Sequence, residues 1–346
     1  MTEWRYITAF ASHLARCGLE DGEVVALLSE SQSRPALVET ARLAAQSLGA
    51  RLFDVVVPTP ASTHSVPIRS TGASQAIAAN PAVIAALSTA QLVIDCTVEG
   101  LLHAPELGAI LGGGARVLMI SNEHPDIFER LGWDNELPRR VGLAHSRLRS
   151  ATEMRVTSDA GTDLTVLLAG AVTAGSTGVT DGPGSIAHWP GGLVIAFPAA
   201  NTVSGILVMA PGDVNLTFNR IVESPIELTI ADGHITDIVG NGVDAQLFRS
   251  YLASFGDRAS YATSHVGWGL NEAARWEAVE LYDRRETWGT EARAIAGNFL
   301  YSTGANEIAG RFTTGHFDLP MRNCTVTLDG VVVVEHGELI AELRSP

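Results

Sequence analysis

Cysteines and basic residues are scarce in this sequence. Its 346 residues include three cysteines, Cys17, Cys96 and Cys324, and no two of them form a C-x-x-C pair. That spacing does not indicate a disulfide framework or a zinc finger, and the apolar neighbours of each cysteine predict a buried thiol. Lys and Arg number 23 against 38 Asp and Glu, a formal net charge of −15. Nucleic acids and anionic membrane surfaces bind through excess basic side chains, so small molecules are the expected partners.

Several sequence signals are also missing. No segment approaches 18 uninterrupted apolar residues, and the N-terminal "MTEWRYITAF" has no basic stretch followed by an apolar run. We therefore expect a cytoplasmic protein with no membrane partner. No G-x-S-x-G follows a predicted strand, and "LGGGA" (111–115) follows a predicted helix. A serine hydrolase and a dinucleotide-binding protein are therefore not indicated.

The first 150 residues alternate between helical and strand patterns. Short strands rich in Val, Ile and Leu are predicted at 22–31, 51–59, 91–97 and 115–122. Segments with helical spacing lie around them at 4–18, 34–50, 74–90 and 104–114. Helices between short apolar strands are typical of a parallel sheet covered on both faces. Residues 1–150 are therefore predicted to form a Rossmann-like α/β domain.

From about residue 151 the pattern becomes strand-rich. Two strands surround an Asp-Ala-Gly turn in 153–170, and 226–240 is a predicted hairpin with an Asp-Gly turn. Helices are predicted only at 244–256 and 272–284. Residues 151–346 are therefore predicted to form a mainly antiparallel α+β domain, which we expect to carry the functional site.

The segment "GHFD" near the C-terminus places His316 and Asp318 two residues apart on a predicted strand. Side chains at i and i+2 of a strand share a face, so the two should lie together while Phe317 packs into the core. The pair has three interpretations that the motif alone leaves open. It is a structural histidine–carboxylate pair, a base with the group that orients it, or two ligands of a metal.

His265, in "ATSHVGWGLN", is the best candidate for a third member of that site, because small residues around it let backbones approach closely. Two histidines with one carboxylate suit Fe(II) with open positions, and they also suit catalytic zinc. His103 follows the strand at 91–97, at the edge where doubly wound sheets bind ligands. His188 lies in a Gly/Pro-rich loop beside a tryptophan, and Ser302 is a further polar candidate. By contrast, His13, His234 and His336 are expected to be solvated.

Four segments resemble one superfamily, in the same order along nearly the whole chain. They are "HWPGGLVIAFP", "ATSHVGWGLNEAA", "LYSTGANEIAG" and "GHFDLPMRNCTVTLDG". The superfamily contains the aminopeptidase T-like metallopeptidases and the 2,5-dihydroxypyridine 5,6-dioxygenases, and the H-x-D is its common metal-binding element. The peptidases need several further glutamates, one of them at the position of Leu193. An apolar side chain there favours the dioxygenase branch.

The resemblance implies one Fe(II) per subunit, held by His265, His316 and Asp318. It implies that the enzyme opens 2,5-dihydroxypyridine, or a close hydroxylated N-heterocycle, with O₂. The product would be N-formylmaleamic acid, in bacterial degradation of nicotinic acid and related pyridines. It also suggests a homo-oligomer, such as a hexamer. The alternatives are a metal-dependent aminopeptidase of the related branch and a member of the fold that has lost catalysis.

Roles for the remaining candidates follow from the chemistry of that reaction. The 5-hydroxyl of the ring must lose a proton, and a neutral histidine suits that task, with His188 as the first choice. His103 is expected to anchor the other polar edge of the substrate, with Ser302 as an additional contact near the metal. Leu101 and Leu102 are expected to supply an apolar wall.

Overall fold

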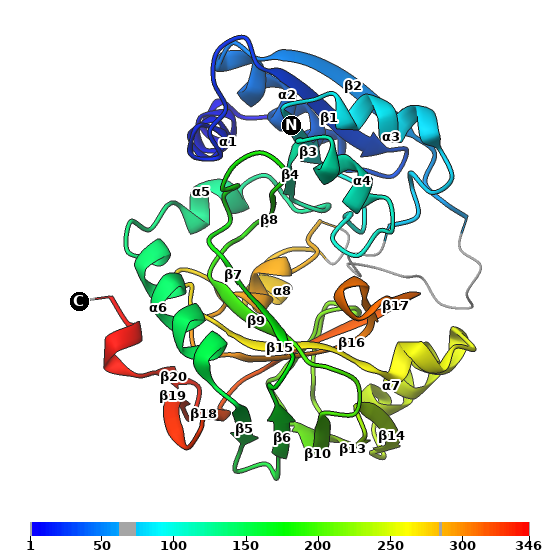
Figure 1. The fold of residues 1–346 in the computed structure, drawn as a ribbon, viewed down its shortest axis with the longest axis vertical. Coiled ribbons are helices and arrows are strands. Elements are labelled where there is room, and N and C mark those ends of the chain that lie inside the picture. The colour runs from blue at the N-terminus through cyan, green and yellow to red at the C-terminus, as the bar shows by residue number, and fades with distance from the viewer. Residues whose placement is uncertain (1, 62–73, 284–285, 346) are drawn as a thin grey trace.

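The computed structural model describes residues 2–61, 74–283 and 286–345. These residues form a five-stranded parallel sheet, an eight-stranded and a five-stranded antiparallel sheet, and a small two-stranded sheet (Figure 1). The predicted combination of a parallel sheet near the N-terminus with antiparallel sheets after it is confirmed. No helix of the described residues is long and apolar enough to cross a membrane.

The parallel sheet has the strand order β2-β1-β3-β4-β8. Its strands are β1 (Val24–Glu30), β2 (Arg51–Val57), β3 (Leu92–Asp95), β4 (Arg116–Met119) and β8 (Ile186–His188). Successive residues of β1 enter different apolar cores, because Val25 and Leu27 pack on one side and Ala26 and Leu28 on the other. The sheet is therefore covered on both faces, as the uninterrupted apolar strands predict.

Five helices belong to this part of the chain: α1 (Trp4–Arg16), α2 (Pro35–Ser47), α3 (Pro81–Ser88), α4 (Leu107–Gly112) and α5 (Ile127–Leu131). Residues of α1, α2 and α5 share one of the two cores, and residues of α3 and α4 share the other. In Figure 1 these helices surround the blue and cyan strands at one end of the molecule. Pro35 and Pro81 each stand at the start of a helix, where the missing N–H costs nothing.

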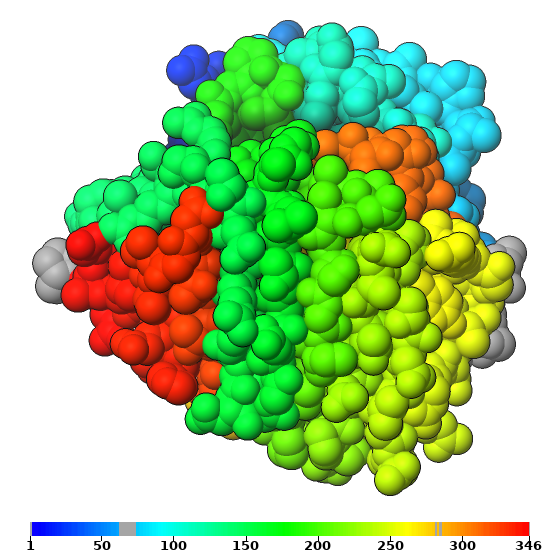
Figure 2. All heavy atoms as spheres, turned by 60° about the horizontal axis from the view of Figure 1, so that its bottom comes forward, coloured from blue at the N-terminus to red at the C-terminus, as the bar shows by residue number. Residues whose placement is uncertain are grey.

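The larger antiparallel sheet has eight strands in the order β14-β13-β10-β6-β5-β18-β19-β20. They are β5 (Glu153–Thr157), β6 (Asp163–Leu167), β10 (Val203–Met209), β13 (Ile226–Ala231), β14 (His234–Val239), β18 (Thr325–Leu328), β19 (Val331–Glu335) and β20 (Glu338–Leu339). Exposed and buried residues alternate along β5, β6 and β13, so one face meets solvent. Figure 2 shows the C-terminal segment, in red, directly beside the green one, as the pairing of β18 with β5 requires.

The second antiparallel sheet has five strands in the order β17-β16-β15-β9-β7. They are β7 (Val172–Ser176), β9 (Leu193–Phe197), β15 (Thr263–Gly269), β16 (Phe299–Asn306) and β17 (Arg311–Met321). β15, β16 and the second half of β17 are buried along their lengths. The small sheet pairs β11 (Val214–Asn215) with β12 (Arg220–Ile221).

One apolar core lies between the two large antiparallel sheets. It contains Val156 and Val166 from the eight-stranded sheet and Val266 and Phe317 from the five-stranded one. Phe317 is fully buried and meets Phe248 of α7 (Val243–Ser254) edge to face, with ring centroids 4.3 Å apart. The prediction that Phe317 packs into the core is confirmed.

Two elements cross the division proposed at residue 150. α6 (Leu137–Ser150) contributes Val141 and Leu148 to the core of the antiparallel sheets. β8 lies after residue 150 but pairs with β4 in the parallel sheet. The division into 1–150 and 151–346 therefore stays a proposal, and these two elements tie the parts together.

The helix predicted over 272–284 is largely wrong. Among its described residues, 272–283, the structure has only the short helix α8 (Ala278–Leu281), preceded by turns. Asn271 forms an isolated bridge with Ile295, and its side chain accepts the N–H of Ala273. Ordinary residues differ in helix propensity by only about a few tenths of a kcal/mol each. Tertiary contacts such as these outweigh a local preference of that size.

Candidate metal centre and active site

The candidate site lies on the five-stranded antiparallel sheet, on the face that points away from the apolar core shared with the eight-stranded sheet. β16 and β17 are in register so that Ser302 pairs with Asp318 and Gly304 with His316. Because side chains alternate along a strand, Phe317 enters the core while His316 and Asp318 share the other face. His265 of β15 joins them there, with its Nε2 3.0 Å from the hydroxyl oxygen of Ser302. The strand register thus brings four predicted side chains together.

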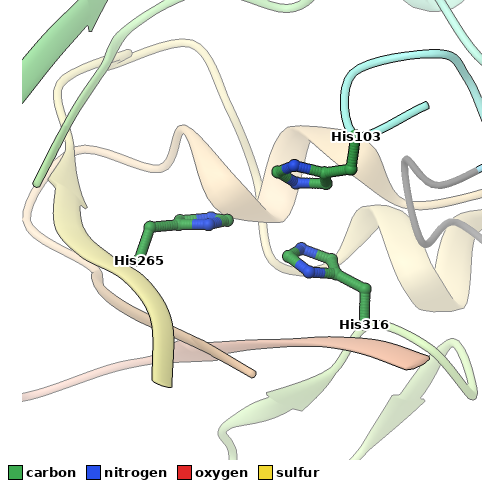
Figure 3. Close-up of side chains that lie close together, drawn as sticks. All are labelled: His103, His265 and His316. Atoms are coloured by element: carbon green, nitrogen blue, oxygen red, sulfur yellow. The ribbon is translucent and has the colours of Figure 1, made fainter. Parts of the chain in front are cut away.

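His103 reaches the same place from the parallel sheet, on the loop that follows β3. The carboxylate of Asp95, at the end of β3, accepts the N–H of Thr97 at 2.9 Å and that of Leu101 at 2.8 Å. These bonds fix the loop that carries His103. Figure 3 shows His103, His265 and His316 pointing toward one another from three separate segments. Each of the three is buried.

One ligand atom from each of these three histidines lies within 4.8 Å of the others. Among the described residues, these three histidines are therefore one set of side chains close enough to hold a metal. Oδ1 of Asp318 lies 3.3 Å from Nε2 of His316 and 3.7 Å from Nε2 of His265. Two ligands that are each about 2.1 Å from one ion are roughly 3 Å apart, so the two separations from Oδ1 of Asp318 are near the spacing of ligands that share one small cation.

Ser302 lies between the same atoms. Its hydroxyl hydrogen-bonds to Oδ1 of Asp318 and lies next to Nε2 of His265. Ser302 was expected to be a polar contact near the metal, and its hydroxyl lies beside two of the proposed ligands, His265 and Asp318.

Arg293, at the end of the 3₁₀-helix η2 (Thr290–Arg293), contacts the carboxylate oxygen of Asp318 that does not face the histidines. Its Nε donates to Oδ2 of Asp318 at 2.5 Å, which leaves Oδ1 to face the histidines. Its Nη1 lies 3.1 Å from Nε2 of His188. A guanidinium can only donate, so Nε2 of His188 accepts and His188 is neutral in this contact. Sequence reasoning missed Arg293, which has no recognisable local motif.

The protonation states of the group are those that a metal needs. Burial lowers the pKa of His265 well below its usual value, and it also lowers the pKa of His316. Burial opposes ionisation of Asp318, but Arg293 and His316 outweigh it and hold the pKa of that carboxyl well below its usual range. Burial and the neighbouring Arg293 lower the pKa of His188 to about 3. Neutral imidazoles and an ionised carboxylate are the forms that bind metal.

These side chains open into a cavity of about 260 Å³. Its apolar wall includes Leu102, Leu193, Ile195, Phe197 and Ile308. Leu102 therefore lies where an apolar wall was expected. Leu101 does not: it is fully buried in the core between the parallel sheet and α3 and α4. The size and lining of the cavity suit a small, flat, largely apolar molecule with a few polar groups.

Comparisons with known proteins agree with this geometry. The family model of 2,5-dihydroxypyridine 5,6-dioxygenase matches residues 5–341. The chain belongs to this family. The 2,5-dihydroxypyridine 5,6-dioxygenase of Pseudomonas putida KT2440 is 36% identical over 346 residues, which cover 98% of this chain and 97% of the relative.

A solved structure of 2,5-dihydroxypyridine dioxygenase from Pseudomonas putida KT2440 superposes with a TM-score of 0.90. That match has 35% sequence identity and covers 98% of each chain. AmpT from Thermus thermophilus superposes with a TM-score of 0.60 at 13% identity, over 98% of this chain and all of the other. The second likeness shows a shared fold. Leu193, the residue that separated the two branches in the sequence, lines the cavity of this dioxygenase family member.

Proposed function

We propose that this chain is a ring-cleaving dioxygenase that opens 2,5-dihydroxypyridine, or a close hydroxylated N-heterocycle, with O₂. The observation that carries the proposal is the convergence of two imidazole nitrogens and one carboxylate oxygen in a buried cavity. It occurs in a chain that belongs to the dioxygenase family over nearly its full length. The aminopeptidase alternative has weaker support, because an apolar side chain lines the cavity where a further carboxylate would be needed.

His265, His316 and Asp318 would hold one Fe(II) per subunit. When bound, the ion supplies open positions for O₂ and activates it for insertion into the ring. The competing ligand set replaces Asp318 with His103. We favour Asp318 because its ionised carboxyl offsets the charge of the ion and because Arg293 aims its free oxygen at the two histidines.

The base that takes the proton of the 5-hydroxyl is proposed to be His103. Its Nε2 is buried and has no hydrogen-bond partner among the described residues, so its lone pair can meet a substrate hydroxyl. His188, the first choice from the sequence, stays a prediction, but the Arg293 contact weighs against it. That contact occupies Nε2 of His188, and a group with a pKa of about 3 is a poor base near neutral pH. His188 would instead help Arg293 to shape the polar end of the cavity.

The finer expectations belong to the same proposal. The product would be N-formylmaleamic acid, with both oxygen atoms of O₂ incorporated, in a cytoplasmic route for pyridine degradation. Ser302 would contact the iron-bound end of the substrate, and Leu102 would contact the ring face. A homo-oligomer such as a hexamer is expected by analogy with the family.

Anaerobic reconstitution with Fe(II), followed by addition of O₂ and 2,5-dihydroxypyridine, tests the proposal. We expect loss of the ultraviolet band of the substrate with one equivalent of O₂ consumed. The variants H103A and H188A should both keep iron, and H103A should lose more of kcat. No O₂ uptake by wild-type enzyme carrying a full complement of iron would sink the proposed function. Hydrolysis of peptides by a two-zinc form would favour the aminopeptidase.

A further inference from the structure

A short contact between His103 and Glu307 joins the two parts of the molecule at the cavity. Nδ1 of His103 lies 2.6 Å from Oε2 of Glu307, although the residues are 204 positions apart. His103 belongs to the loop after β3, and Glu307 is the first residue of η3 (Glu307–Ala309), which follows β16. Both side chains line the cavity. The contact is therefore part of the site, and both residues lie outside the ligand set that we favour, His265, His316 and Asp318.

Both ends of this contact are held rigidly. On one side, the side chain of Asn306 accepts the N–H of Ala309 at 3.0 Å and donates to the carbonyl oxygen of Ser264 at 2.9 Å. Glu307 is therefore presented from a fixed turn beside the strand that carries His265. On the other side, the carboxylate of Asp95 fixes the loop of His103. The ring of His103 also rests against that of His316, with centroids 4.4 Å apart.

The direction of the hydrogen bond follows from the chemistry of the two groups. Burial opposes ionisation of Glu307, but the hydrogen bond from His103 outweighs it and lowers the pKa of that carboxyl. An ionised carboxylate can only accept, so Nδ1 of His103 must carry the hydrogen. In the neutral imidazole the lone pair then lies on Nε2. Nε2 is the buried atom of His103 that lacks a partner.

We propose that Glu307 is a positioning residue: by accepting the Nδ1–H of His103 it fixes the ring and its tautomer, so that Nε2 meets the substrate as a hydrogen-bond acceptor. The inference rests on the proposed function, because it assumes a substrate with a hydroxyl group. Without Glu307 the ring could turn, or its hydrogen could move to Nε2. The nitrogen would then donate a hydrogen bond and could not accept one from the hydroxyl.

The test uses the iron-loaded enzyme and two variants, E307A and E307L. Removing an oriented second partner of a histidine typically costs roughly 10- to 100-fold, and we expect kcat to fall by that amount in both variants. Metal analysis should show iron occupancy unchanged in both. The Glu307 side chain is 29% exposed, so the space left in E307A is open to small solutes. Added formate should restore at least a third of the lost activity in E307A but none in E307L, where leucine fills the space.

A double-mutant cycle identifies the residue through which Glu307 acts. In an H103A background, adding E307A should change kcat by less than about twofold, and formate should not activate H103A. Three results would overturn the proposal: wild-type kcat in E307A, an undiminished effect of E307A in the H103A background, or loss of iron from E307A. The last would make His103 an iron ligand. Failure of the wild-type enzyme to cleave any dihydroxypyridine would instead overturn the proposed function, so the two failures are distinguishable.

Discussion

Buried polar groups gather in two places, and they differ in how well their hydrogen bonds are satisfied. At the carboxyl edge of the parallel sheet, Glu123 is fully buried and accepts four hydrogen bonds, from Thr287, Trp288 and Thr290. Asp95 beside it accepts three. At the cavity, Nε2 of His103 and Nδ1 of His316 have no hydrogen-bond partner among the residues that the structure describes.

We infer a structural role for the two saturated carboxylates and a functional role for the two nitrogens at the cavity; atoms without a partner also occur elsewhere, among them Oε2 of Glu30 at the same edge. A buried polar atom without a partner costs roughly 1 to 3 kcal/mol, so folding alone does not favour it. The saturated carboxylates fasten loops, which is a structural role. The unsatisfied nitrogens face one cavity, where a ligand can supply the missing partner. Doubly wound sheets usually bind ligands at their carboxyl edge. Here Trp288 lies over that edge, with its indole N–H donating to the carbonyl oxygen of Val98.

Removing a proposed metal ligand from the five-stranded antiparallel sheet should have the largest effect on iron binding and activity. We expect H316A and D318A to bind less than about a tenth of the iron that wild-type enzyme binds and to show no ring cleavage, because each loses one of three ligand atoms. Metal analysis after anaerobic reconstitution measures this. H234A, which alters a histidine at a distant hairpin, should keep its iron. Full iron occupancy in D318A would show that the three histidines bind the metal without it.

Changing a saturated carboxylate should instead lower stability. E123Q replaces one acceptor oxygen by an NH₂ group, which faces backbone and hydroxyl donors that it cannot satisfy. We expect the free energy of unfolding to fall by about 2 to 4 kcal/mol, while one iron still binds per folded chain. Denaturant unfolding followed by circular dichroism gives the first quantity. If E123Q were as stable as wild type but unable to bind iron, the structural role of Glu123 would be wrong.

A smaller effect is expected from His13, a buried histidine whose Nε2 lies 2.8 Å from the carbonyl oxygen of Gly178. Burial lowers its pKa to about 4 from 6.5, so the unfolded chain binds a proton more readily than the folded one. Stability from this group is therefore full above pH 6.5 and falls as the pH drops toward 4. Between pH 7 and 5.5 the free energy of unfolding should fall by about 1 kcal/mol, because a difference of one pKa unit between the folded and unfolded chain corresponds to about 1.4 kcal/mol. H13Q should show a shallower loss over that range in thermal unfolding; an identical slope would contradict the assignment.

Local pattern was enough to predict the strands and the pairing of His316 with Asp318. Apolar runs, turn residues and the two-residue period of a strand are all short-range signals. They also correctly placed Phe317 in the core. His265 was a candidate on local grounds, and the resemblance added the family and the ligand set.

The missed features depend on contacts between distant segments. Nothing near Arg293 or Glu307 in the sequence shows that they meet Asp318 and His103. His13 was predicted to be solvated but is 8% exposed, because its helix packs against the loop at Gly178. Leu101 and Leu102 are adjacent, and only the path of their loop decides which one faces the cavity.

The connection between β8 and β9 limits how the site can move. Residues 189–192 alone separate His188, the last residue of β8 in the parallel sheet, from Leu193, the first residue of β9 in the five-stranded antiparallel sheet. A Cβ on Gly191 would lie 2.0 Å from the backbone of Thr177, and one on Gly192 2.6 Å from Asn271. Residues 189–192 are packed too tightly to act as a hinge. The two sheets should therefore move as one body at this connection. Ile308 lines the cavity and is 45% exposed, so we expect substrate to enter beside it.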